Sequence, residues 1–235
     1  MGVPNRILYG ARLSGKLDDN WRIGLLNAQT TDDAFKGISA ANYSVASVQR
    51  KVFSRSNIAA IFVNKQTLHP ELGRNLSRFN RVGGLEYNFT SKDSRWQGKA
   101  YYHQSFSEDK RKDGFANGFS AMYSVLKYTF RWAHDWVGKG YDAEVGFVPR
   151  KDFIRINPTV GFSFYPRTRL VNRYSVGVAL EQYHMPNVGI TDRTLGPFLS
   201  MSFQNSARML CLSIRTIPTC FRTLMLCEAM ENSLP

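Results

Sequence analysis

The sequence predicts an all-β fold, an antiparallel up-and-down transmembrane β-barrel. Two observations predict it: segments in which apolar and polar residues alternate, and connections that are short and long in turn. A barrel in an outer membrane has tight periplasmic turns at one end and longer extracellular loops at the other. A soluble sandwich has no reason to keep its long loops at one end of every hairpin.

Eleven segments carry the alternation, and their lengths suit strands that cross a bilayer at a tilt, which takes roughly 9–11 residues. The segments are 6–16, 21–30, 42–53, 58–65, 81–90, 96–106, 116–124, 127–137, 153–165, 172–183 and 195–204. The short connections are 17–20, 54–57, 91–95, 125–126 and 166–171. The long connections are 31–41, 66–80, 107–115, 138–152 and 184–194.

Each segment divides into two stripes, because successive strand residues point to opposite faces. In a membrane barrel the apolar stripe meets lipid and the small or polar stripe lines the lumen. We therefore expect arginine at Val178 or Phe162 to destabilise the protein, and Gly177→Ser and Ser163→Asn to be nearly silent. In segment 42–53 the alternation slips near Ser47, as at a bulge. Aromatic residues near segment ends suit interfacial girdles: Trp21, Trp96, Phe106, Trp136 and Tyr183.

Composition agrees with a single domain of 235 residues. The mean hydropathy is −0.32, and no run approaches the 18 or so apolar residues of a membrane-spanning helix. The formal charge is +13, from 31 Lys and Arg against 18 Asp and Glu. This charge belongs to solvated loops and lumen walls, or it favours anionic partners such as lipopolysaccharide, anionic solutes or nucleic acid.

Basic residues gather on the stripe predicted to face the lumen. The candidate lumen-facing residues are Arg12, Arg22, Lys99, Lys127, Arg131, Arg155 and Arg173, accompanied by Lys16 and Lys65. The same stripe carries only Glu86, Asp135 and Glu181 as acids. Either these charges pair across strands and hydrate the lumen, or they form an electropositive lumen that selects anions. Loop 138–152, apolar around Val145, either folds inward as a constriction or packs on a neighbouring loop.

The sequence offers no catalytic, cofactor-binding or metal-binding motif. Its four histidines, His69, His103, His134 and His184, are far apart and have no metal-ligand spacing. His134 and Asp135 are adjacent and so point to opposite faces of a strand. No Gly-x-Ser-x-Gly elbow, phosphate loop or dinucleotide-binding motif occurs. We therefore expect no enzyme activity, no cofactor and no metal.

Both ends of the sequence indicate a piece of a longer chain. No signal peptide precedes segment 6–16, although an outer-membrane protein needs one. Segment 6–16 leads into a short turn, and short turns are periplasmic, so this segment runs inward from the outer face. An upstream strand is therefore expected, because a barrel normally begins on the periplasmic side. Bacterial barrels have an even number of strands, whereas eleven are predicted here. An unclosed sheet leaves backbone groups at its edges without hydrogen bonds in lipid. This chain alone is therefore expected not to form a conducting monomeric pore. The expected domains are 1–205, a partial barrel, and 206–235, a non-barrel tail that is frame-shifted or disordered. From Ser206 onward there is no Gly, Tyr or Trp, and all three cysteines lie there.

Several motifs carry a family resemblance. The first are Arg6-Ile-Leu-Tyr-Gly-Ala-Arg and Trp21-Arg-Ile-Gly-Leu-Leu-Asn-Ala, and the most distinctive is His134-Asp-Trp-Val-Gly-Lys-Gly-Tyr-Asp-Ala-Glu-Val-Gly-Phe-Val-Pro. Residues 6 to about 204 resemble the C-terminal barrel of Bacteroidetes-type outer-membrane proteins in the domain-of-unknown-function 5916 family. The resemblance implies an outer-membrane location and an upstream module similar to family 9 carbohydrate-binding domains. It implies lipid and lipopolysaccharide as partners, with glycans bound through the upstream module, and it carries over no catalytic residue.

Two classes of function remain open. The first is a non-enzymatic outer-membrane barrel for surface glycan binding, transport or scaffolding. The alternative is a soluble basic β-protein that binds nucleic acid or another polyanion. Nucleic-acid-binding folds of that kind interleave basic and aromatic residues on one exposed face. Here the two kinds of residue sort onto opposite stripes, which favours the barrel and no nucleic-acid partner.

Overall fold

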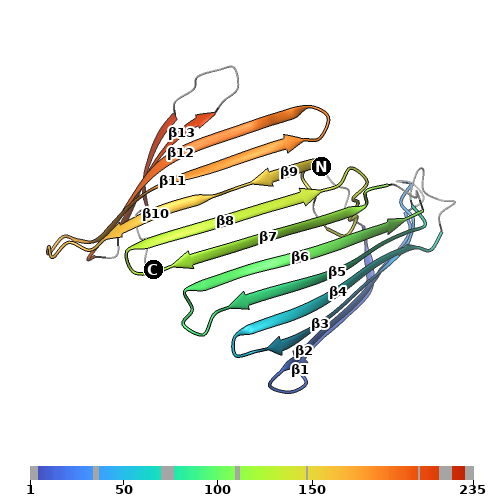
Figure 1. Cartoon of the computed structure of the whole chain (residues 1–235). Coiled ribbons are helices and arrows are strands. Elements are labelled where there is room, and N and C mark those ends of the chain that lie inside the picture. The colour runs from blue at the N-terminus through green and yellow to red at the C-terminus, as the bar shows by residue number, and fades with distance from the viewer. Residues whose placement is uncertain are drawn as a thin grey trace. The chain divides into compact units, whose positions relative to one another are not determined.

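The computed structural model describes residues 5–33, 37–69, 77–108, 112–146, 148–205, 207–216 and 224–230. These residues form strands, turns and loops (Figure 1). No helix in the described ranges is long and apolar enough to cross a membrane. The strands are β1 (Ile7–Lys16), β2 (Trp21–Thr30), β3 (Ala41–Val52), β4 (Ser56–Thr67), β5 (Phe79–Thr90), β6 (Trp96–Ser107), β7 (Phe115–Ser124), β8 (Tyr128–Val137), β9 (Phe153–Ile156), β10 (Thr159–Phe164), β11 (Val171–Met185), β12 (Gly189–Phe203), β13 (Arg208–Thr216) and β14 (Leu224–Met230).

All strands belong to one antiparallel sheet in which neighbours along the chain are neighbours in the sheet. The order runs from β1 through β8 to β10, β11, β12, β13 and β14, and β9 pairs with β8 and β11 beside this path. The predicted all-β, antiparallel up-and-down class is therefore confirmed.

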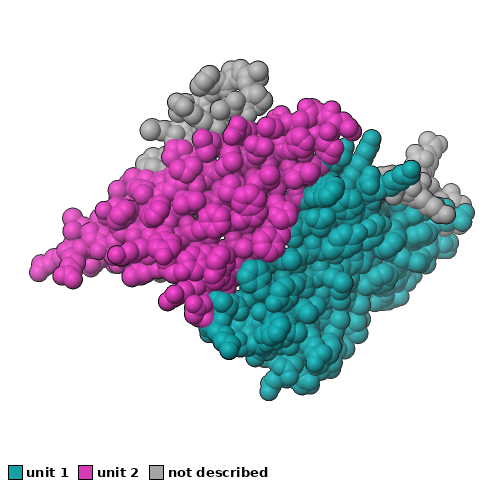
Figure 2. Space-filling model, in the orientation of Figure 1, with its two compact units in different colours: residues 1–92, 99–118, 136–152 teal, residues 93–98, 119–135, 153–235 magenta. Residues whose placement is uncertain are grey.

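The chain divides into two compact units, which Figure 2 shows in different colours. Unit 1 comprises residues 1–92, 99–118 and 136–152, and it contains β1 to β5 with most of β6. Unit 2 comprises residues 93–98, 119–135 and 153–235, and it contains β9 to β14 with most of β8.

The predicted segments from 6–16 to 127–137 coincide with β1 to β8, with ends that differ by at most two residues. The predicted bulge in β3 is wrong, because β3 pairs without a register shift with β2 and β4. The sequence alternation slips for another reason. Val45 is an apolar residue opposite Leu26 and Val63, on the face that elsewhere carries polar residues.

The predicted segment 153–165 is two strands, β9 and β10, interrupted at Asn157 and Pro158. Proline has no backbone N–H to donate to a ladder, which explains the interruption. Asn157 still exchanges backbone hydrogen bonds with Ala133 of β8, and the Leu180 N–H donates to the Pro158 carbonyl at 3.0 Å. The broken strand therefore keeps its place between β8 and β11.

The predicted long connection 184–194 is wrong. β11 continues to Met185 and β12 begins at Gly189, so that only residues 186–188 lie between them. The Val188 N–H donates to the Met185 carbonyl at 3.1 Å, and Gly189 has a φ of +93° that other residues rarely adopt. The polar residues of this segment predicted a loop, but they lie in the paired strands of a longer hairpin, as Asp192 does opposite Tyr183.

Residues 206–235, predicted as a non-barrel tail, contain two further strands. β13 pairs with β12, and β14 pairs with β13, both antiparallel. Ladder hydrogen bonds join backbone groups, so pairing does not require side chains that alternate. The expectation that this tail adds no strand to the sheet is thus wrong, because β13 and β14 continue it. The domain boundary at residue 205 stays a prediction.

Candidate functional surface, the polar face of the sheet

Strand register shows which residues share a face, because directly opposed residues point to the same side. In unit 1 the row Lys16, Arg22 and Gln49 lies on the same face as the pair Lys65 and Asn80. In unit 2 the row Arg131, Thr159, Ala179 and Gly196 shares a face with the row Thr129, Gly161, Gly177 and Phe198. We call these surfaces the polar face of unit 1 and the polar face of unit 2, and the opposite surfaces the apolar faces.

The apolar faces expose large side chains. In unit 1, Leu13 is 59% exposed and Leu85 is 61% exposed. In unit 2, Phe162 is 52% exposed and Val178 is 48% exposed. The buried hydrophobic residues in the described ranges are mostly small: Ala40, Ala41, Val82, Ala116, Ala133, Val137 and Tyr141. The predicted separation into an apolar and a polar stripe is therefore confirmed for these strands, and the larger side chains of the apolar faces are exposed. The exception is the middle of the polar face of unit 1, which carries Leu26, Val45 and Val63.

Aromatic rings gather at strand ends. In unit 2, Tyr123 lies between Trp96 and Tyr128, with ring centroids 4.9 and 6.1 Å away. In unit 1, Phe115 and Trp136 meet edge to face at 5.0 Å. Trp96 and Trp136 thus lie near strand ends as predicted, and their part in an interfacial girdle stays a prediction. Tyr183 does not, because it is opposite Arg155 on the polar face, where its hydroxyl donates to Glu181 Oε1 at 3.3 Å.

The polar face of unit 1 carries a cluster around Glu86. Lys99 Nζ lies 2.8 Å from Glu86 Oε2, and His103 Nε2 lies 3.3 Å from Glu86 Oε1 without hydrogen-bond geometry. The His103 ring covers Gly84, where an ideal Cβ would lie 2.3 Å from its Cδ2. Sequence spacing predicted that His103 is isolated. Its neighbours Glu86 and Gly84 could not be predicted, because they belong to the adjacent strand β5.

The polar face of unit 2 carries a second cluster, around Arg155. Its guanidinium Nη2 lies 2.5 Å from Asp135 Oδ2, and its Nη1 lies 3.4 Å from Glu181 Oε1. Asp135 belongs to β8, Arg155 to β9 and Glu181 to β11, so one guanidinium joins three strands. For Arg155 and Lys99, the interpretation as cross-strand pairs is correct.

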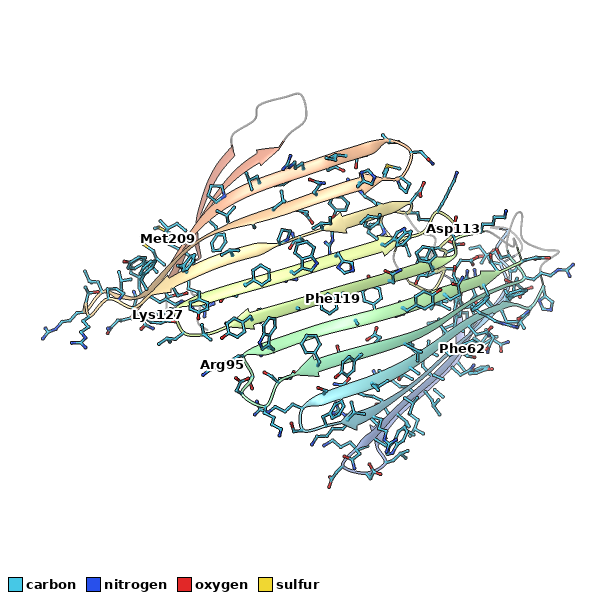
Figure 3. The ribbon with its side chains drawn as sticks, viewed as in Figure 1. Phe62, Arg95, Asp113, Phe119, Lys127 and Met209 are labelled. Carbon is cyan, nitrogen blue, oxygen red and sulfur yellow. The ribbon has the colours of Figure 1, made fainter. Side chains whose placement is uncertain are left out.

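The other five candidates make no ion pair with a carboxylate of the described residues. They are Arg12, Arg22, Lys127, Arg131 and Arg173. Arg12 and Arg22 are in unit 1, and the other three are in unit 2. Figure 3 labels Lys127, which lies in the tight turn before β8, and Arg95, which lies in the tight turn before β6. Cross-strand pairing therefore applies to two of the seven candidates, and anion selection by the other five stays a prediction.

An aromatic ring packs on glycines in the polar face of unit 2. Phe198 Cζ would lie 3.4 Å from an ideal Cβ on Gly161 and 2.3 Å from one on Gly177. The Val160 carbonyl oxygen would lie 2.4 Å from that second Cβ. The expectation that Gly177→Ser is nearly silent is therefore wrong on this geometry, since backbone and ring leave no room for a side chain.

Part of loop 138–152 folds onto the polar face of unit 1. The Asn80 side chain binds the backbone of Asp142 and Glu144, and Lys65 forms an ion pair with Glu144. These contacts place Asp142 and Glu144 on the sheet, while the Gly140 N–H donates to the Asp113 carbonyl of a neighbouring loop at 3.2 Å and Val145 is 40% exposed. Packing on a neighbouring loop is thus observed, and the inward constriction stays a prediction; Phe147 lies outside the described residues. Burial raises the pKa of the neighbouring Tyr141 hydroxyl.

Metal ligands do not gather in the part of the chain that the structure describes: no group of three or more His, Cys, Asp or Glu residues could hold an ion there.

The register and the two contrasting faces define an antiparallel up-and-down all-β protein that exposes an apolar face in each unit. The family model of a domain of unknown function, DUF5916, matches residues 4–213, and the chain belongs to this family. Neither a curated protein nor a solved structure matches the chain.

Proposed function

We propose that this protein is the membrane-embedded barrel of a non-enzymatic outer-membrane protein. The observation that carries the proposal is the exposed apolar face, with Leu85 61% exposed in unit 1 and Phe162 52% exposed in unit 2. Soluble monomers rarely expose contiguous apolar patches of more than a few hundred Å². In a bilayer the same surface is matched to lipid, and each polar face becomes a lumen wall.

The polar faces suggest what such a lumen handles. Arg12, Arg22, Lys127, Arg131 and Arg173 have no carboxylate partner among the described residues, and charged rings of one sign select ions of the other. We propose passage or binding of anionic solutes. The resemblance to barrels that follow a carbohydrate-binding module supports a role in surface glycan handling, transport or scaffolding.

Extraction and vesicle flotation test the location. The purified chain should stay in solution only with detergent, and after refolding it should float with phospholipid vesicles in a density gradient. Heat-denatured chain added to the same vesicles is the control for adsorption. A monodisperse monomer without detergent would contradict the proposal.

The alternative, a soluble basic protein for nucleic acid or another polyanion, rests on the net charge of +13. It predicts salt-sensitive binding of double-stranded DNA by the detergent-free chain, because released counterions drive such binding. A detergent-free, DNA-binding monomer would favour this alternative over the barrel.

A further inference from the structure

The inner segment, residues 141–144 of the loop between β8 and β9, crosses three strands on the polar face of unit 1. The Asp142 N–H donates to Ser105 Oγ of β6 at 3.1 Å. The Asn80 amide of β5 donates to the Asp142 carbonyl at 3.1 Å and accepts from the Glu144 N–H at 3.2 Å. Glu144 reaches Lys65 of β4, where Nζ lies 2.5 Å from Oε2.

Asn80 is the anchor of this arrangement. Its side chain is 1% exposed, the most buried of the large side chains in the described ranges. A buried amide is costly to leave unsatisfied, and here both of its ends are bonded to the backbone of the inner segment. Val82, the next residue of β5 on the same face, is 7% exposed. The hydrogen bonds of Asn80 to Asp142 and Glu144 therefore hold the inner segment on the sheet, two residues along β5 from Val82.

The inner segment also carries the acids that this end of the polar face would otherwise lack. Glu144 pairs with Lys65, and Asp142 Oδ1 lies 2.7 Å from Lys151 Nζ. At the tight-turn end of unit 1, by contrast, Arg22 has no carboxylate partner among the described residues. On the polar face of unit 1, Lys65 at the long-loop end is thus paired with an acid, whereas Arg22 at the other end is not paired with one in the described part of the chain.

We propose that residues 141–144 form a fixed constriction at the long-loop end of the lumen. Adjacent strands are about 4.8 Å apart, so a segment that contacts three of them covers roughly 10 Å of lumen wall. In this arrangement Asn80 positions the segment, and Glu144 cancels the charge of Lys65 where solutes enter. The inference rests on the proposed function, because it takes the polar face as a lumen wall.

Thiol labelling of the full-length chain refolded in detergent tests the inference without requiring a membrane. The reporter is Val82→Cys, with Asn88→Cys on the same face of β5 as the matched control. Both are made after Cys211, Cys220 and Cys227 are replaced by serine. A water-soluble methanethiosulfonate should label Val82→Cys much more slowly than Asn88→Cys. Adding Asn80→Ala should raise labelling of Val82→Cys by about tenfold, since two hydrogen bonds are lost, and leave Asn88→Cys unchanged.

A milder variant covers the case in which Asn80→Ala fails to fold. Glu144→Gln keeps the volume of the side chain and removes the charge that pairs with Lys65. The ratio of the labelling rate of Val82→Cys with an anionic reagent to its rate with a cationic reagent should rise by about twofold or more. The reason is that the charge of Lys65 is no longer neutralised by Glu144.

Equal labelling of the two reporters in the parent background would overturn the constriction, as would a Val82→Cys rate that neither substitution changes. These outcomes are independent of flotation. A chain that fails to float but protects Val82→Cys would contradict the outer-membrane proposal and leave the segment as loop packing, which also defeats its role as a constriction.

Discussion

The two faces of β10 and β11 in unit 2 are built in opposite ways. On the apolar face, Phe162 is 52% exposed and Val178 is 48% exposed. On the polar face, Gly161 and Gly177 lie beneath the ring of Phe198, and Ser163 and Ser175 join their hydroxyls at 2.8 Å. A sheet on a water-soluble core hides its large residues and exposes its small ones. Here the arrangement is inverted, which supports the proposed membrane barrel, in which large apolar residues meet lipid.

The largest expected effect comes from a charge on the apolar face. Val178→Arg should lower the free energy of unfolding by about 2–4 kcal/mol if the residue lies near the bilayer midplane, because lipid cannot solvate the charge. Denaturant titration of the chain refolded in vesicles measures it. Phe162→Arg should behave alike, whereas Ser163→Asn on the polar face should change stability by less than about 0.5 kcal/mol. Equal effects on both faces would show that the faces are assigned wrongly.

A side chain added beneath Phe198 should have the next largest effect. Gly177→Ser should destabilise by about 1–3 kcal/mol, because the new Cβ meets the Phe198 ring and the Val160 carbonyl. Gly10→Ser on the polar face of unit 1 is the matched control, since the nearest atom to a Cβ built there lies 3.8 Å away. The same titration reports both. Addition of Phe198→Ala should recover part of the loss, and a Gly177→Ser variant as stable as Gly10→Ser would refute the packing described.

Breaking the Arg155 cluster should cost less. Arg155→Met removes the ion pairs with Asp135 and Glu181 and should destabilise by about 1 kcal/mol, since the pairs are partly exposed to solvent. A double-mutant cycle with Asp135→Asn isolates the coupling. Additive losses in that cycle would mean that the observed pair contributes no interaction energy.

The smallest effect is expected where a cation has no acidic partner in the described part of the chain. Lys127→Gln should alter unfolding free energy by less than about 0.5 kcal/mol, because no ion pair is lost. It should instead weaken binding of an anionic solute to the refolded chain, which calorimetric titration with a sulfonated dye would measure. A loss of stability as large as that of Arg155→Met would reveal a partner for Lys127.

Much of the sheet could be predicted from sequence because the signal is local. Strand β8, for example, alternates aromatic residues from Tyr128 to Trp136 with small or charged ones, and period two needs no knowledge of partners. The signal failed where local pattern and backbone disagree. Pro158 splits an alternating segment, Asp192 lies in a strand despite its charge, and β13 pairs although its side chains do not alternate as expected.

The polar face was predictable as a list of residues but not as an arrangement. Stripe membership placed Lys99 and Arg155 on one face, yet nothing in the sequence distinguishes them from Arg131, which has no acidic partner among the described residues. The pairing depends on register between strands. The packing of Phe198 could not be predicted either, because the pattern of its own strand says nothing about the residues opposite it. Only the register shows that its ring covers glycines of the neighbouring strands.

The contacts of the inner segment also impose an order of assembly. Asp142 binds Asn80 across 62 residues and Ser105 across 37, while Glu144 meets Lys65 across 79. Each hairpin of the sheet closes a far shorter loop, and the entropy of closure grows with loop length. The partners of the inner segment exist as a surface only after β4, β5 and β6 have paired. We therefore expect docking of this segment to follow pairing of β4, β5 and β6 in folding. Stopped-flow refolding should then show a phase after sheet formation that is absent in Asn80→Ala, while the hairpins form at their usual rate.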